Sequence, residues 1–222
     1  MRIYLLSILI LLISCNQPEK LLLERGNNIA SSKIIGKDSL YVEISNSKNI
    51  IIAKGIVYKD TLKIGKWDLF DDKGIIDKTI EYMLIQGKQY SNQVWYYNDS
   101  KEDTIYDVSN YFKFSGLKKK YNKGDTAFIE VQYKPIFTSY SELILVTGEG
   151  IEKNFSNIDE VRMDTIDAEN MKFDLNIILD KHGNENIRGY LKEFYIGRKT
   201  ENDPIEYHTG ILYFDKSIFV NN

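Results

Sequence analysis

This chain of 222 residues contains few histidine and cysteine side chains, which are the usual ligands of zinc and other transition metals. The two histidines are His182, in an Asp-Lys-His-Gly-Asn turn, and His208, in a strand-like run; Cys15 is the only cysteine. Zinc sites need three or four ligands, and no H-x-x-x-H pattern, H-E-x-x-H pattern or cysteine cluster supplies them. The sequence therefore predicts no metal site, no other cofactor and two ordinary structural histidines.

Catalytic motifs are equally sparse. Ser115-Gly116-Leu117-Lys118 matches S-x-x-K and so resembles the nucleophile motif of penicillin-recognising enzymes. In those enzymes the serine opens a helix, whereas residues 111–114 predict a strand end here, and the S-D-N and K-T-G motifs are missing. The acid-rich segments 98–103 and 180–186 lack calcium-loop spacing. We interpret the match as chance and expect no enzyme, although a Ser-His-acid triad stays open because its members converge only in space.

The first residues have the pattern of an export signal. Arg2 precedes an apolar run, 3–13, which is too short to span a bilayer. The run ends in Leu12-Ile13-Ser14-Cys15, which resembles the lipobox of bacterial lipoproteins. In that family the cysteine thiol receives a diacylglycerol, and the signal peptide is cut off before it. The resemblance implies a signal peptide over 1–14 and lipid attachment at Cys15.

The predicted lipid attachment indicates where in the cell the rest of the chain is located. Two or more acyl chains attach a protein stably to a membrane, so we expect a lipid-anchored protein of the cell envelope. We favour the outer membrane over the inner one, and the face of the membrane stays open. Residues 15–38 are polar apart from 21–23, which predicts a lipidated N-terminus and a flexible tether of about 25 Å.

The composition favours an all-β fold without a nucleic-acid partner. The chain has 16 Tyr, 10 Phe and only 3 Pro, a balance typical of pleated sheet. Its formal net charge is −3. The one basic cluster, 118–120 with Lys123, is consistent with a solvated turn, whereas nucleic-acid binding needs a basic face or stripe.

Residues 39–110 alternate β-like runs with turn signals, which predicts a β-meander. The runs are 50–58, 65–70, 75–84 and 93–97, and turns are predicted between them at 59–60, 71–74 and 87–88 and after the last run at 98–100. A glycine, two aromatic residues and a second glycine in this region resemble the G-x-W-x-x-[YF]-x-x-x-G repeat of the MORN-like family, which includes the YwqK-type proteins described as antitoxins. These residues are Gly65, Trp67, Phe70 and Gly74, and a partial second copy contains Trp95 and Tyr97, with Gln93 and Glu102 in place of its glycines.

The two tryptophans differ in their predicted surroundings. Trp67 shares a strand face with Gly65 and Leu69, which predicts a position in the core of the meander. Trp95 shares its face with Gln93 and Tyr97 and is predicted to be less buried.

Residues 111–222 carry longer alternating runs. In 127–133 and 171–177, apolar residues occupy every second position, as a half-buried strand requires. Further runs lie at 143–146, 187–196 and 205–214. We predict an antiparallel β-sandwich domain, with an immunoglobulin-like arrangement as one variant.

Three functions stay open from the sequence. The leading hypothesis is a membrane-anchored, non-catalytic module that binds a protein or another envelope partner, because an anchor and β domains occur without an assembled catalytic motif. The YwqK-type resemblance implies an immunity or antitoxin protein as an alternative. A glycan-binding module is the third, because exposed Tyr and Trp rings can stack on sugars.

Overall fold

The computed structural model describes residues 23–25, 28–98, 103–134, 141–167, 172–197 and 206–222. These residues form strands, turns and loops, which confirms the predicted all-β fold class. None of them forms a helix long and apolar enough to cross a membrane. The predicted signal peptide and Cys15 lie outside the described residues.

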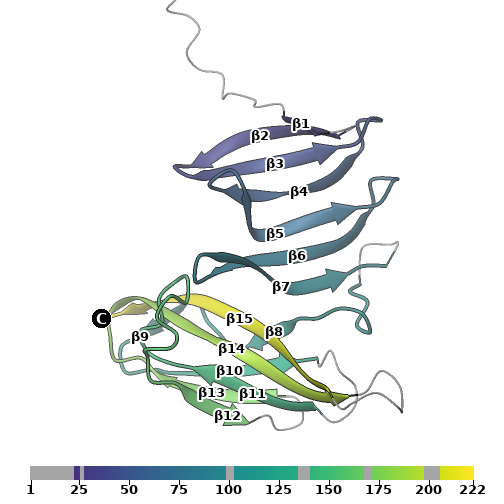
Figure 1. The fold of residues 1–222 in the computed structure, drawn as a ribbon. Coiled ribbons are helices and arrows are strands. Elements are labelled where there is room, and N and C mark those ends of the chain that lie inside the picture. The colour runs from purple at the N-terminus through teal and green to yellow at the C-terminus, as the bar shows by residue number, and fades with distance from the viewer. Residues whose placement is uncertain (1–22, 26–27, 99–102, 135–140, 168–171, 198–205) are drawn as a thin grey trace, which may run out of the picture.

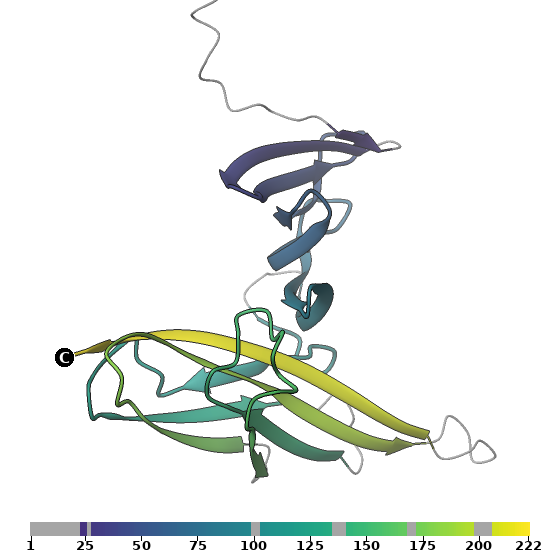
Figure 2. The same ribbon diagram turned by 60° about the vertical axis from the view of Figure 1, so that its left-hand side comes forward.

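The N-terminal part is a seven-stranded antiparallel sheet in which each strand pairs with the next along the chain. Figure 1 shows the strands stacked above the rest of the molecule, and Figure 2 shows them as one twisted layer. The strands are β1 (Leu23–Arg25), β2 (Asn28–Gly36), β3 (Ser39–Ser45), β4 (Ile51–Tyr58), β5 (Leu62–Phe70), β6 (Ile76–Ile85) and β7 (Lys88–Tyr96). This strand order is a β-meander.

The sheet begins earlier in the chain than the sequence predicts, so the flexible tether predicted over 15–38 is wrong for part of that segment. Strands β1 and β2 occupy residues 23–25 and 28–36 of that segment, and β2 pairs with β3 over its length. A strand in a single layer has no face that must be fully apolar, so it lacks the alternation by which strands are recognised. The part of the predicted tether that precedes Leu23 lies outside the described residues.

Tight turns with left-handed backbone connect the meander strands. Lys59 and Asp60 have φ values of 48° and 61°, as a type I′ turn between β4 and β5 requires. Gln86 and Gly87 have φ values of 50° and 77° between β6 and β7. The first turn lies where the sequence predicts it, and the second lies one residue earlier.

The C-terminal part consists of a three-stranded and a five-stranded sheet, which is consistent with the predicted β-sandwich. The strand orders are β13-β10-β8 and β12-β11-β14-β15-β9. The strands are β8 (Phe112–Ser115), β9 (Lys120–Asn122), β10 (Thr126–Tyr133), β11 (Ser141–Thr147), β12 (Asp164–Asp167), β13 (Lys172–Ile178), β14 (Gly183–Gly197) and β15 (Glu206–Asn221). The immunoglobulin-like variant stays a prediction.

One apolar core lies between these two sheets. On β10 the alternation is as predicted: Ala127, Ile129 and Val131 are buried, and Phe128 between them is 68% exposed. On β13, Phe173 is buried too, while Met171 lies outside the described residues. The five-stranded sheet contributes the other side of the core with Leu143, Leu145, Ile187, Leu191, Leu212, Phe214, Ile218 and Val220.

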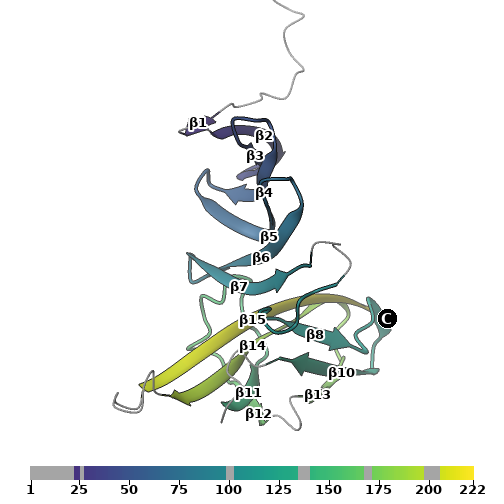
Figure 3. The same cartoon turned by 90° about the vertical axis from the view of Figure 1, so that its right-hand side faces the viewer.

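The two parts meet where β7, the last strand of the meander, lies beside β15 (Figure 3). The chain then leaves β7, and Asn110 pairs with Val94 before β8 begins. The predicted boundary between residues 110 and 111 falls in this connection.

Candidate functional site

Gly65 and Trp67 build a β-bulge in the middle of the meander. The pairing of β4 with β5 leaves three β5 residues, 65–67, opposite Gly55 alone. Gly65 has a φ of 64°, a conformation that glycine adopts at little cost. The bulge places the Trp67 indole over Gly55.

Trp67 is fixed by contacts on its neighbouring strand and is only 1% exposed. A Cβ atom on Gly55 would lie 2.4 Å from the indole, so the ring fits only over glycine. The indole Nε1 donates to the carbonyl oxygen of Ile56 at 3.0 Å. The Lys63 ammonium lies 4.6 Å from the ring centre. The predicted buried position of Trp67 is confirmed, and its ring is closed to ligands.

The partial second copy contains a different bulge. Here Asn92 and Gln93 lie opposite Glu81. Both side-chain amides donate to the same carboxylate oxygen of Glu81, each at 2.7 Å. Since β6 has a glutamate where β4 has Gly55, no indole can fold over this bulge.

Trp95 lies on the opposite face of the sheet from Trp67. The two tryptophans pair with adjacent residues of β6, Thr79 and Ile80, and successive residues of a strand point to opposite faces. Trp95 is half-buried, which confirms its lower predicted burial. Its ring centre lies 6.1 Å from that of Tyr111.

The remaining motif residues stabilise the far end of these strands. Gly74, with a φ of 77°, donates its N–H to the Asp71 carbonyl oxygen at 3.0 Å in the β5–β6 turn. Phe70 is half-buried at the end of β5. The Tyr97 hydroxyl bonds the Thr79 hydroxyl at 3.2 Å. The motif residues therefore lie on both faces of the sheet and do not form one site.

Polar side chains of β7 fasten the meander to the β-sandwich. The Asn92 amide donates to the Tyr213 carbonyl oxygen at 2.8 Å and accepts the Tyr213 N–H at 2.7 Å. The Tyr90 hydroxyl donates to the Ile211 carbonyl oxygen at 2.8 Å. Gln93 accepts the N–H of the first residue of β8 at 3.0 Å. Asn92 and Gln93 are buried, so these bonds satisfy amides that would otherwise be costly to bury.

An aromatic cluster surrounds this connection. The Tyr213 ring centre lies 5.3 Å from that of Tyr90, 5.0 Å from that of Phe155 and 5.8 Å from that of Tyr190. Burial raises the pKa of both Tyr90 and Tyr213 above the ordinary tyrosine value.

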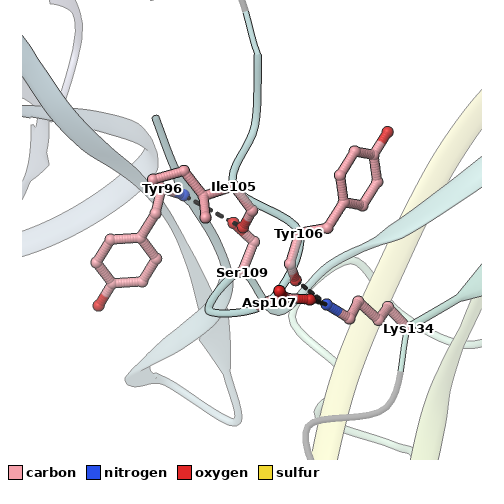
Figure 4. Close-up of polar contacts among 6 residues, drawn as sticks. All are labelled: Tyr96, Ile105, Tyr106, Asp107, Ser109 and Lys134. Atoms are coloured by element: carbon pink, nitrogen blue, oxygen red, sulfur yellow. Dashed lines mark hydrogen bonds and ion pairs between the residues drawn. The ribbon is translucent and has the colours of Figure 1, made fainter. Parts of the chain in front are cut away.

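The connection continues in segment 103–110, whose contacts Figure 4 shows. The Ser109 hydroxyl accepts the Tyr96 N–H at 2.9 Å and donates to the Ile105 carbonyl oxygen at 2.7 Å. The Lys134 ammonium, at the end of β10, bonds the Asp107 carboxylate at 3.1 Å and also the Tyr106 carbonyl oxygen. Both parts of the molecule therefore hold this segment in place.

A groove of about 800 Å³ opens beside the connection, and we call it the junction groove. This volume is in the range of ordinary ligand sites. Apolar residues of both parts line it: Tyr58, Leu62, Ile64, Tyr82, Met83 and Leu84 from the meander, and Phe112, Tyr213 and Phe214 from the β-sandwich. Of the motif residues, only Gly65 is among those that line it.

Charged residues border the junction groove, and its acids are engaged in contacts. These residues are Lys59, Glu81, Lys153, Asp215 and Lys216. Glu81 accepts the two amides described above. Asp215 Oδ1 lies 2.9 Å from Arg188 Nε, an ion pair without hydrogen-bond alignment. The lysines come from three separate elements: the β4–β5 turn, the loop after β11, and β15.

The candidate catalytic residues lie on separate elements. Ser115 is the last residue of β8, and Gly116 follows with a φ of 81°, so the S-x-x-K serine lies at a strand end, as expected. His182 is an exposed turn residue, and His208 is half-buried in β15. No three His, Cys, Asp or Glu side chains among the described residues could hold a metal ion together.

Comparison with known proteins adds no relative: no family model, no curated protein and no solved structure matches the chain. The junction groove is therefore interpreted from its own residues.

The residues that build the junction were not found from the sequence. Gln93 stands two residues before Trp95, where the repeat pattern has a glycine, and this departure was its only signal. Asn92 gave no signal. Tyr90 and Tyr213 are two of 16 tyrosines, and nothing in their spacing connects them. Their partners are 121 residues away in the chain.

Proposed function

We propose that this chain is a lipid-anchored, non-catalytic binding protein of the bacterial cell envelope, and that the junction groove holds its protein partner. The observation that carries the proposal is the groove itself, an apolar concavity that two firmly connected β parts build together. Both parts contribute lining residues, and the hydrogen bonds between β7 and β15 hold the two parts together beside the groove.

The surface of the groove suits a protein partner. Leu62, Ile64 and Met83 are half-buried on a single-layer sheet, and charged side chains border them. A central apolar area with a polar rim is the usual organisation of a protein interface. Binding of a partner would remove this partly exposed apolar area from water, which favours association.

The proposed lipid anchor, which rests on the lipobox resemblance, is compatible with this role. Lipid on Cys15 would hold the meander near a membrane, and the outer membrane is the one we favour. In the described residues β1 is the strand nearest to Cys15 in the chain, while the β-sandwich, which supplies one side of the groove, lies at the opposite end of the meander (Figure 1). The first strands of the sheet would then separate the membrane from the groove, whose lining begins at Ser39 in β3.

The test is affinity capture from detergent-solubilised envelopes with groove-blocked protein. Ser39 is half-buried and lines the groove, so Ser39→Trp should fill part of it. Gln132→Trp, on the exposed face of β10, is the matched control. We expect one partner to be recovered with wild type and with the control variant but not with Ser39→Trp. Equal recovery with all three proteins would refute binding in the groove.

A further inference from the structure

The junction groove has a cationic border in a chain whose formal net charge is −3. Lys59 and Lys153 are exposed, and Lys216 is half-buried. Their aromatic contacts leave the ammonium charge in place: Lys59 Nζ lies 5.3 Å from the Tyr58 ring centre, and Lys216 Nζ lies 5.3 Å from that of Phe114.

The acids of the groove do not balance these lysines. The Asp215 carboxylate is compensated by Arg188 at 2.9 Å. The Glu81 carboxylate keeps its negative charge, because the two N–H groups that it accepts at 2.7 Å belong to the neutral amides of Asn92 and Gln93. Three lysines against the one carboxylate of Glu81 leave the lining with a net positive charge beside its apolar residues.

We propose that the partner enters the groove as an extended peptide segment in which acidic and apolar residues alternate. This proposal rests on the proposed function and names the chemistry of the partner. Side chains of an extended chain point alternately to opposite sides. Apolar ones can therefore cover Ile64 and Met83 while acidic ones turn outward to the lysines.

The distribution of the lysines favours a peptide over a lipid headgroup. They come from three separate elements, the β4–β5 turn, the loop after β11 and β15. A single phosphate or carboxylate would need its cations gathered at one point. Several carboxylates spaced along a chain match cations from several elements.

The experiment measures peptide binding to the full-length lipidated protein in nanodiscs of zwitterionic lipid. The probe is a short fluorescent peptide that alternates aspartate with leucine, and lysine-leucine and aspartate-serine peptides serve as comparisons. We expect only the aspartate-leucine peptide to bind, and raising the salt from about 0.05 to about 0.5 M should weaken its binding, because exposed charges are screened.

Two matched triple variants locate the binding site. K59E/K153E/K216E reverses the groove lysines, and K118E/K119E/K120E makes the same charge change at exposed positions away from the groove. Exposed charge pairs typically change an equilibrium two- to fivefold each, so the groove variant should bind roughly 30-fold more weakly and the control within about twofold of wild type. Thermal unfolding of both variants shows whether they are folded. If a triple variant is unfolded, single Lys→Gln variants at the same positions are measured instead.

The possible results separate the two proposals. Equal binding of the lysine-leucine peptide, equal loss in both triple variants, or no binding of the aspartate-leucine peptide would overturn the acidic-segment proposal. A third kind of result would also overturn it: wild-type protein binds vesicles of anionic phospholipid, the groove variant does not, and neither protein binds the peptides. The capture experiment with Ser39→Trp uses no peptide, so a partner lost there would maintain the proposed function even if this inference failed.

Discussion

Replacing Gly55 with alanine should destabilise the meander, although the change adds only one methyl group. The Cβ atom would lie 2.4 Å from the Trp67 indole, closer than non-bonded atoms can approach. Either the indole leaves its place over β4, or the β5 bulge shifts. Both movements would lengthen the 3.0 Å hydrogen bond from Trp67 Nε1 to the Ile56 carbonyl oxygen.

The expected cost follows from these contacts. Overpacking a close contact costs about 1 to 3 kcal/mol, and a lost hydrogen bond adds about 0.5 to 1.5 kcal/mol. We therefore expect Gly55→Ala to lower the free energy of unfolding by about 2 to 4 kcal/mol. Trp67→Ala should cost about 3 to 5 kcal/mol, as truncation of a buried Trp usually does, and Trp95→Ala should cost less because Trp95 is half-buried.

A double-mutant cycle isolates the contact between the two residues. Once Trp67 is alanine, the space over Gly55 is open, so adding Gly55→Ala should cost less than about 0.5 kcal/mol and can even stabilise the strand. The assay is urea unfolding of the soluble protein comprising residues 16–222, followed by fluorescence and circular dichroism. A cost for Gly55→Ala that is the same with and without Trp67, or no cost at all, would refute this packing.

Three further changes probe the anchor and the junction. Cys15→Ser should abolish fatty-acid labelling and membrane attachment, and labelling that persists would contradict lipid attachment at this residue. Asn92→Leu leaves the Tyr213 backbone groups without their side-chain partner and should cost about 2 to 4 kcal/mol in urea unfolding, whereas Ser91→Ala at the exposed neighbouring position should cost less than about 0.5 kcal/mol. Because burial raises the folded-state pKa of Tyr90 and Tyr213, their stabilising contribution is complete below the ordinary tyrosine pKa of about 10 and is lost as the pH rises through the higher folded value. The urea midpoint should therefore fall above about pH 10, less so in Tyr213→Phe, and an equal fall in that variant would show that Tyr213 does not contribute.

Local pattern was sufficient to predict the fold class and several strands. The alternation in 127–133 predicts β10 because one face of that strand enters the sandwich core, and the apolar company of Trp67 predicts its burial. In both places the apolar or polar character of the side chains shows which of them are buried. The Lys59–Asp60 turn was readable because a charged pair interrupts two apolar runs.

Features set by distant parts of the chain could not be predicted in the same way. The contacts of Asn92 and Tyr90 depend on β15, and no local spacing encodes a partner 121 residues away. Gly55 was missed because its role is to leave space for an indole on the next strand. Strand β2 was missed because a single-layer sheet does not impose apolar alternation.

Photo-crosslinking in living cells tests most directly whether the junction groove holds a partner. The full chain, with Cys15 intact, would carry p-benzoylphenylalanine either at Met83, which lines the groove, or at Phe128, which is 68% exposed on the outer face of β10. Partner binding in the groove predicts a discrete adduct from Met83, lost when Ser39→Trp is added, and none from Phe128. An adduct from Phe128 with none from Met83 would contradict it.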